Sequence, residues 1–325
     1  GMFGFVDGGP IEKVGLENAD ITGKERVGGL VGKNFGTVSN SYATGNVYGD
    51  KEVGGLVGFN FGNTTASYAT SDVSGTGNDL GGLVGSNVGN TSGSYATGNV
   101  SGTGMKNVGG LAGVSEGEIT ESNATGIVSG NNLVGGLVGV NTGTVTESYA
   151  TGNVSGTGDV VGGLVARNFG ATVTKSYATG SVTGIKGVGG LVGINSGISS
   201  AEVSESYAAG SVTGTDDVGG LVGVNNRTVS DSYWDTARTN QSDGVGRDAG
   251  GTATNMVGLT TPEMTGDRAA GNMGPFDFSS TWQNTSDDDS VEGYGVFYPT
   301  LQNNTQQPTP SSTLYAGGFG SSGSP

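Results

Sequence analysis

The side chains that could take part in chemistry recur at regular intervals along this 325-residue chain, so each residue type forms a series. A tyrosine series follows a serine in most repeats, an asparagine series comes shortly after a Gly-Gly-Leu sequence, and acidic and basic residues precede that sequence. Tyrosine rings can stack on sugar rings, amides can form hydrogen-bonded ladders, and paired carboxylates can act as general acids and bases or bind calcium. Which chemistry applies depends on the fold that places each series.

The Gly-Gly-Leu sequence marks a tandem repeat. Its leucines lie 26 to 30 residues apart, at Leu30, Leu56, Leu83, Leu111, Leu137, Leu164, Leu191 and Leu221. Gly-Gly interrupts every copy, and the short runs between the glycines favour strands through Val, Thr and Tyr, which excludes helical repeats. The 68 glycines have no three-residue period, which excludes collagen.

Each copy contains three strand candidates, for example "VGGLV", "TVSNSYA" and "NVYG" in the first copy, separated by turn residues. Three strands and three corners form one coil of a solenoid, and glycine suits tight corners and a narrow interior. We therefore predict an all-β fold: a right-handed parallel β-solenoid, or β-helix, of about eight coils of 26–30 residues with a C-terminal cap.

The ends of the chain differ from the repeats. The segment 11–23 matches the second half of a coil, because Asp20 to Gly23 align with Asn46 to Gly49, so residues 1–26 are predicted to form a partial coil or cap. After the repeats of residues 27–234, apolar residues such as Trp282 concentrate, and an open coil needs covering. We predict a capping segment at 235–301 and a flexible linker or tail at 302–325, which is either a link to further domains of a longer protein or a free end.

Composition excludes several classes of function. The chain has 13 basic and 29 acidic residues, a net charge of −16, which argues against nucleic acid as a partner. It contains no Cys and no His, so it has neither disulfides nor the commonest general base. No apolar run is long enough to span a membrane.

The asparagine series is predicted to be structural, with each amide bonded to the amides of the coils above and below. It comprises Asn34, Asn60, Asn87, Asn141, Asn168, Asn195 and Asn225. The tyrosine series is the candidate ligand-binding row: Tyr42, Tyr68, Tyr95, Tyr149, Tyr177 and Tyr207. Strand alternation favours an outward row that would bind sugars, with Ser and Ala facing inward; the alternative is a bulge that turns the tyrosines into the core.

Acidic residues show no catalytic pattern. The loop before each Gly-Gly-Leu changes sign and residue type from coil to coil, which indicates a solvated edge, and no catalytic residue is assigned. The run Asp287, Asp288 and Asp289 is a weak candidate for calcium binding. No other cofactor is expected.

The repeated "GGLVGxNxGTVxxSYATGxVxG" resembles the GLUG motif, which occurs in tandem in bacterial and archaeal surface proteins such as haemagglutinin-like adhesins and some immunoglobulin A peptidases. The resemblance covers residues 27 to about 236. It implies a secreted or cell-surface context and no catalytic residues.

We therefore expect a non-catalytic structural or adhesive protein at the cell surface or outside the cell, a rigid stalk that contacts a glycan or a protein. The alternatives are a carbohydrate-binding module with an exposed tyrosine row, a polysaccharide-active enzyme with an acidic groove, and a segment of a viral fibre. Exposed tyrosines would distinguish the first alternative, and stacked carboxylates would distinguish the second.

Overall fold

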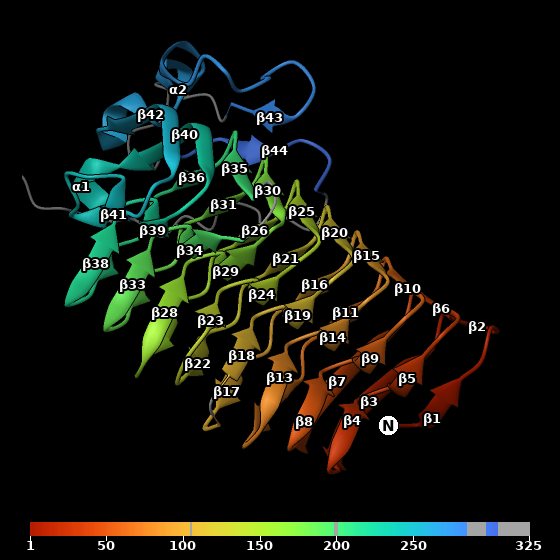
Figure 1. Ribbon diagram of the computed structural model, residues 1–325. Helices are drawn as coiled ribbons and strands as arrows, with labels where there is room; N and C mark the ends of the chain where they lie inside the picture. The colour runs from red at the N-terminus through yellow and green to blue at the C-terminus, as the bar shows by residue number, and fades with distance from the viewer. Residues whose placement is uncertain (105, 198–200, 285–296, 305–325) are drawn as a thin grey trace, which may run out of the picture.

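The chain winds into a parallel β-solenoid. A computed structural model describes residues 1–104, 106–197, 201–284 and 297–304, and within them the solenoid makes about nine turns and contains almost no helix. Successive coils lie side by side along one axis (Figure 1). The predicted all-β parallel solenoid is confirmed.

Three parallel sheets form the walls, and we name them sheets I, II and III. Sheet I contains β1 (Phe3–Val6), β5 (Val31–Asn34), β9 (Val57–Asn60), β14 (Val84–Asn87), β19 (Ala112–Ser115), β24 (Val138–Asn141), β29 (Val165–Phe169), β34 (Val192–Ser196), β39 (Val222–Asn225) and β41 (Val245–Asp248). Sheet III contains β4 (Glu25–Gly28), β8 (Lys51–Gly54), β13 (Asn78–Gly81), β18 (Lys106–Gly109), β23 (Val134–Gly135), β28 (Asp159–Gly162), β33 (Lys186–Gly189) and β38 (Asp216–Gly219).

Sheet II is bent, because most coils contribute several short strands to it. The strands that follow the Asn turn are β2 (Pro10–Glu12), β6 (Thr37–Ser39), β10 (Asn63–Thr65), β15 (Asn90–Ser92), β20 (Glu118–Thr120), β25 (Thr144–Thr146), β30 (Thr172–Thr174) and β35 (Glu202–Ser204). Most of the strands at the tyrosine position are short: β11 (Tyr68–Ala69), β16 (Tyr95–Ala96), β21 (Asn123–Ala124), β26 (Tyr149–Ala150), β31 (Tyr177–Ala178) and β36 (Tyr207–Ala208). Those at the next valine are β12 (Asp72–Gly75), β17 (Val100–Gly102), β22 (Val128–Gly130), β27 (Val154–Gly156), β32 (Val182–Thr183) and β37 (Val212–Thr213). Longer strands span these positions in β3 (Gly15–Thr22), β7 (Tyr42–Gly49), β40 (Thr228–Asp235) and β42 (Thr252–Leu259).

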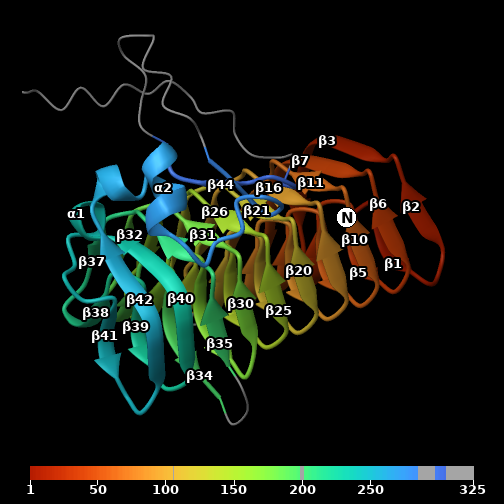
Figure 2. The ribbon, with the colours of Figure 1, turned by 90° about the horizontal axis from the view of Figure 1, so that it is seen from above.

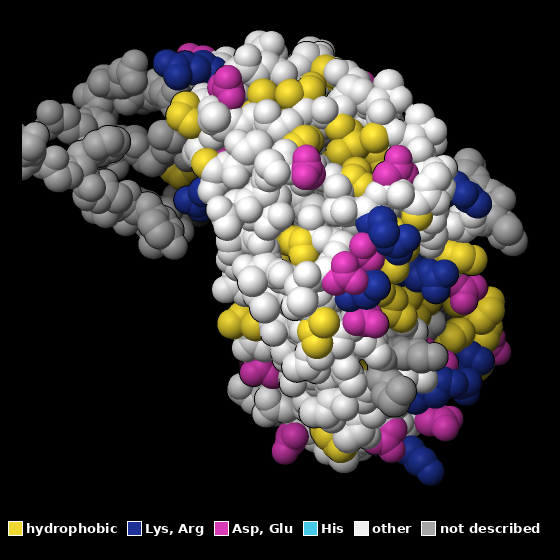
Figure 3. All heavy atoms as spheres, turned by 60° about the vertical axis from the view of Figure 1, so that its left-hand side comes forward, with side chains coloured by type: hydrophobic (Ala, Val, Ile, Leu, Met, Phe, Trp, Pro, Cys, Tyr) yellow, Lys and Arg dark blue, Asp and Glu magenta, His cyan; other side chains and the backbone are white. Residues whose placement is uncertain are grey.

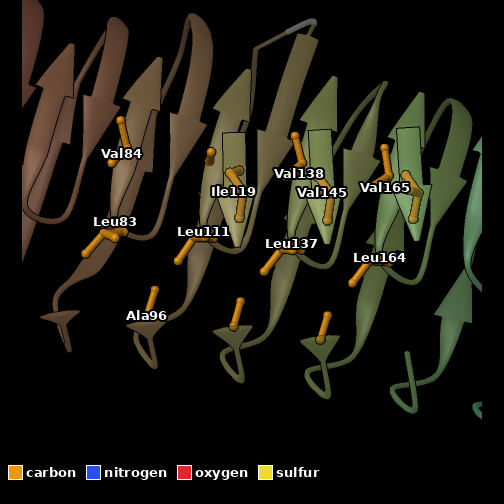
Figure 4. Packing of buried hydrophobic residues seen from close by; sticks show 14 of the residues in the cluster. Leu83, Val84, Ala96, Leu111, Ile119, Leu137, Val138, Val145, Leu164 and Val165 are labelled. Atoms are coloured by element: carbon orange, nitrogen blue, oxygen red, sulfur yellow. The ribbon is translucent and has the colours of Figure 1, made fainter. Parts of the chain in front are cut away.

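The core is a set of columns made by equivalent residues. Leu137 lies between Leu111 and Leu164, with its backbone N–H 2.8 Å from the carbonyl oxygen of Leu164, and all three leucine side chains are fully buried (Figure 4). A second column of valines, including Val154 and Val161, fills the corner between sheets II and III. Because each coil repeats the same residues in the same register, burial in one coil predicts burial in the next.

The Gly-Gly sequence lets neighbouring coils approach closely. A Cβ atom on Gly136 would collide with the carbonyl oxygen of Gly163 in the next coil. The chain also bends here, between β23 and β24, so the predicted "VGGLV" strand is two strands. Glycine is required at this position because the backbone of the adjacent coil occupies the space of a side chain.

The N-terminal segment adds more of a coil than the sequence indicated. Asp20 pairs with Asn46 as predicted, and β1 also pairs with β5, with Phe3 opposite Val31. Residues 3–6 therefore form a strand of the first half of this coil, which the prediction had taken to be absent. Their sequence, Phe-Gly-Phe-Val, lacks the Gly-Gly-Leu and Asn landmarks, and for that reason the alignment missed them.

The C-terminal segment has two parts. β41 and β42 extend sheets I and II by pairing with β39 and β40. The chain then continues through η1 (Thr261–Glu263), α2 (Asp267–Asn272), β43 (Trp282–Gln283) and β44 (Thr300–Leu301), and lies along the side of the solenoid over β26 and β31 (Figure 2). A short helix, α1 (Thr236–Thr239), lies between β40 and β41.

This placement changes the predicted boundaries. Gln302, assigned to the tail, donates from its Nε2 atom to the carbonyl oxygen of Trp282 at 2.7 Å, so it belongs to the packed segment. Residues 305–325 lie outside the described part of the chain. In the described residues, no helix combines the length and the apolar character needed to span a bilayer.

Candidate functional site

The asparagine series forms a buried column at the end of sheet I. The Nδ2 atom of Asn34 donates to Oδ1 of Asn60 at 2.8 Å, and the same bond joins Asn60 to Asn87 at 2.9 Å. Further along, Asn141, Asn168, Asn195 and Asn225 are linked at 3.0, 3.0 and 3.1 Å. The amides also bond turn carbonyls, such as that of Gly62. These side chains are fully buried and bond one another across coils.

A serine column that the sequence analysis did not assign lies at the corner just before the tyrosine-position strands of sheet II. The backbone N–H of Ser148 donates to Oγ of Ser176 at 3.2 Å, and the Oγ of Ser148 donates to the carbonyl oxygen of Thr146 at 2.7 Å. The same pattern links Ser41 to Ser67 and continues to Ser232. The signal was present, because a serine precedes this strand even in the coil where Ser122 is followed by Asn123.

The tyrosine series points away from the coil interior. The residue two positions earlier, such as Glu147 with φ of 45° or Lys175 with φ of 49°, adopts a left-handed conformation and turns the chain at the corner. After it, Ser148 and Ala150 face inward and are buried, and Tyr149 lies on the opposite face of the strand, outside the main core. The outward orientation that strand alternation favoured is therefore the one that the structure shows.

The row is a stack of parallel rings in two parts. Tyr42, Tyr68 and Tyr95 stack with centroids 5.0 and 4.8 Å apart. Tyr149, Tyr177 and Tyr207 stack at 4.9 and 5.0 Å. Asn123 occupies the position between the two parts. The first three rings are partly exposed, so they form the accessible part of the candidate row.

The C-terminal segment covers the second part of the row. Trp282, itself fully buried, lies 5.7 Å from the Tyr207 ring and 6.2 Å from the Tyr177 ring, centroid to centroid. Phe276 contacts Tyr233 edge to face at 5.2 Å. The prediction that Tyr149, Tyr177 and Tyr207 contact a ligand is therefore wrong. Their exposed fractions are 0, 4 and 0%, because the C-terminal segment occupies their outer face.

Polar contacts complete this packing. The hydroxyl of Tyr207 donates to the carbonyl oxygen of Pro299 at 2.7 Å, and the hydroxyl of Tyr298 donates to Oδ2 of Asp235 at 2.5 Å. At the far end, Nδ2 of Asn123 donates to Oδ1 of Asn304 at 3.4 Å. Asn304 also donates to the carbonyl oxygen of Glu147 at 3.3 Å. The described part of the segment therefore extends along the row as far as the Asn123 position.

The comparisons with known proteins identify the repeat. The family described as the GLUG motif matches residues 23–48, 130–155 and 158–183. The chain is a GLUG-motif repeat protein. No curated protein and no solved structure matches it. The coils outside the matched ranges continue the same register, as where Leu80 pairs with Val53 and Val108, so the matched repeats and the coils between them form one continuous solenoid.

Burial of the tyrosines affects their ionisation. Desolvation raises the pKa of Tyr149, and raises those of Tyr177 and Tyr207 well above the ordinary value of a phenol. It raises the pKa of Tyr233 to about 12. The packing of the C-terminal segment on the GLUG array therefore requires neutral phenols.

Charged side chains pair along the strands of sheet III and with the neighbouring strand β41. Arg26 pairs with Glu52 at 2.9 Å, Lys186 with Asp216 at 2.8 Å, and Arg247 with Asp217 at 2.9 Å. Figure 3 shows basic and acidic side chains lying next to one another on this side of the molecule. Burial raises the pKa of Asp79, which accepts a hydrogen bond from Asn107 at 2.7 Å. The residues that the structure describes contain no group of three acids placed to hold a metal ion. The calcium candidate Asp287–Asp289 lies outside the described residues.

An exposed phenylalanine cluster on the N-terminal GLUG coils was not predicted. Phe5, Phe35 and Phe61 are 56, 39 and 49% exposed, and their neighbouring ring centroids are 5.5 and 5.0 Å apart. The ammonium group of Lys33 lies 4.5 Å from the centroid of Phe35. A signal existed in the sequence, because "NFG" recurs at residues 34–36, 60–62 and 168–170.

Proposed function

We propose that this protein is a non-catalytic structural stalk that acts in adhesion outside the cell, holding its lateral faces rigidly for contact with a glycan or protein surface. The observation that carries the proposal is how the recurring polar groups are used. Asparagine amides and serine hydroxyls recur along the array, and both are bonded between or within coils. Polar groups used in this way stiffen the array.

The dimensions support a spacer role. At roughly 4.8 Å per coil, the turns of the solenoid, about nine in number, extend about 40 Å. Columns of leucine, valine and asparagine run along this length, so bending the rod would strain several columns at once. The extracellular setting is supported by the tandem GLUG repeats, which resemble those of surface adhesins.

The proposal is tested by attachment under flow. Beads coated with the protein are passed over mucin, fibronectin, chitin and cultured epithelial cells, beside beads coated with albumin or with the Leu137→Asp variant. We expect retention of the protein-coated beads on at least one surface and none of either control. Retention no higher than albumin on every surface would refute an adhesive role, and protein-dependent release of reducing ends from the polysaccharides would indicate an enzyme instead.

A carbohydrate-binding module is the second candidate, because Tyr42, Tyr68 and Tyr95 are partly exposed in a regular stack. A glycan array comparing the protein with a variant in which all three are changed to Ser tests it. Tyr48→Ser is the matched control, since Tyr48 is 41% exposed and takes no part in the stack. Glycan binding lost only in the triple variant would favour this candidate.

A further inference from the structure

The two parts of the tyrosine row have the same geometry and different surroundings. Tyr68 pairs in register with Tyr42 and Tyr95, as Tyr177 does with Tyr149 and Tyr207. The ring planes deviate from parallel by 4 and 6° in the first part and by 4 and 3° in the second. The difference is that the described part of the C-terminal segment covers the second part.

We propose that the exposed stack of Tyr42, Tyr68 and Tyr95 is a docking site for a short segment of a partner polypeptide that carries an indole or phenyl side chain. The covered stack shows the chemistry of such an occupant. Over it lie the indole of Trp282, tilted by 49° to the ring of Tyr207, and the backbone carbonyl of Pro299, which accepts from the Tyr207 hydroxyl. A polypeptide supplies both features at once, an aromatic ring and backbone acceptors.

The stacking favours a peptide over a sugar. Each ring in the stack lies against its neighbours, so the middle ring, Tyr68, presents its edge and hydroxyl to the outside. Tilted and edge-to-face partners such as Trp282 use ring edges, whereas a sugar needs an open ring face on which to lie. The hydroxyls then provide donors for backbone carbonyls.

The corner residues that border the exposed stack carry no charge. The left-handed corner residues beside it are Asn40, Ala66 and Gly93, whereas beside the covered stack the equivalent residues are Glu147, Lys175 and Glu205. Thr70 and Thr97 form an exposed polar rim. The charged group bonded to the stack is Glu17, whose Oε1 accepts from the Tyr42 hydroxyl at 2.7 Å.

The described part of the intramolecular contact reaches the coil next to this surface. Asn304 is bonded at Asn123, one coil away from Tyr95, so the proposed site continues the surface that the segment already occupies. This continuity extends an observed interface to the next, accessible rings. The inference rests on the proposed function in one respect, that the tyrosine row is a surface for contact with another molecule. It adds the class of partner, a polypeptide.

Binding of a labelled peptide tests the proposal. The probe is a fluorescein-labelled synthetic peptide with the sequence of residues 275–284, PFDFSSTWQN, titrated with the whole protein and followed by fluorescence anisotropy. We expect saturable binding to the protein and to Tyr48→Ser, and binding weaker by at least about tenfold in the triple Tyr42→Ser, Tyr68→Ser, Tyr95→Ser variant. A probe with Ser at the position of Trp282 should bind as weakly as the natural probe binds the triple variant.

Three outcomes would overturn the inference. Equal affinity for the protein and the triple variant would place the peptide elsewhere, including on the covered stack after displacement of the C-terminal segment. Glycan binding that needs the three tyrosines, without peptide binding, would assign the row to a sugar. Self-association in sedimentation experiments that needs them, again without peptide binding, would assign it to a second copy of the chain.

The controls separate this inference from the proposed function. Circular dichroism checks that the triple variant is folded. If the triple variant is unfolded, the single Tyr68→Ser variant, which removes only the middle ring, is used in its place. Beads that adhere under flow while the peptide fails to bind refute the docking site alone. Peptide binding by a protein that adheres to no surface refutes the adhesive role alone.

Discussion

Removing one amide from the middle of the asparagine column tests whether that column stabilises the rod. Asn168 is fully buried, and its Nδ2 atom lies 2.8 Å from the carbonyl oxygen of Ala171 and 3.0 Å from Oδ1 of Asn195. Its Oδ1 accepts from Asn141 at 3.0 Å. Asn168→Ala removes these three bonds, and a longer one of 3.3 Å from Nδ2 to the carbonyl oxygen of Glu202, and leaves polar groups on both neighbouring coils with fewer partners.

The size of the effect follows from these contacts. At about 1 kcal/mol for each short hydrogen bond, the loss in the free energy of unfolding is about 3 kcal/mol. The chain itself contains serine in place of asparagine at the equivalent position of another coil. Ser115 replaces asparagine in another coil, and its hydroxyl accepts from Asn87 and donates to Gly117, both at 3.2 Å. We therefore expect Asn168→Ser to keep two of the bonds and to lose only about 1 kcal/mol.

Guanidinium denaturation followed by circular dichroism measures both variants. The matched control is Asn63→Ala, which removes an exposed asparagine side chain and should change the free energy of unfolding by less than about 0.5 kcal/mol. The expected order of stability is control, Asn168→Ser, Asn168→Ala. The reasoning fails if Asn168→Ala unfolds at the same denaturant concentration as the control, or if serine is as damaging as alanine.

Three further changes have defined outcomes. Leu137→Asp places a charge in the fully buried leucine column and should lower the free energy of unfolding by about 4 kcal/mol or more. Its control, Ile127→Asp, lies at a site that is 54% exposed and should leave the melting curve nearly unchanged. Equal melting of the two variants would contradict the assigned register. Raising the pH from about 10 towards about 12, the value to which burial raises the pKa of Tyr233, should release the C-terminal segment. A phenol whose pKa is raised in the folded protein contributes stability below its unfolded pKa, and that stability is lost as pH rises. The fluorescence of Trp282 should shift to the red before far-ultraviolet circular dichroism changes, and simultaneous changes would count against a separate release. Burial raises the pKa of Asp79, so its ionised form is disfavoured in the folded protein and Asp79→Asn should be the more stable protein at pH 7. That advantage should shrink as pH falls through the raised pKa and be gone below the unfolded pKa of about 4, and a pH-independent difference would assign the effect to another cause.

Much of the fold was predictable because the repeat spacing is a local property that every coil shares. The spacing of Leu30, Leu56 and Leu83 implied stacked equivalents, and these leucines do lie in one buried column. Alternation along the strand implied that Tyr149 and Ala150 lie on opposite faces, as observed. Strands without the landmarks were missed, as with Phe3–Val6, because an aligned strand needs only a compatible backbone and an inward apolar residue.

The repeat spacing is enough to specify a parallel β-solenoid with GLUG repeats, since identical residues at a constant spacing can satisfy their backbone and amide hydrogen bonds by stacking. Which tyrosines are accessible, in contrast, depends on contacts between distant parts of the chain. Tyr207 and Trp282 are far apart in the chain and belong to no shared period, so no pattern could place one over the other. Their contact depends on a non-periodic segment burying its aromatic side chains against the solenoid, and such long-range burial is a property of the folded molecule.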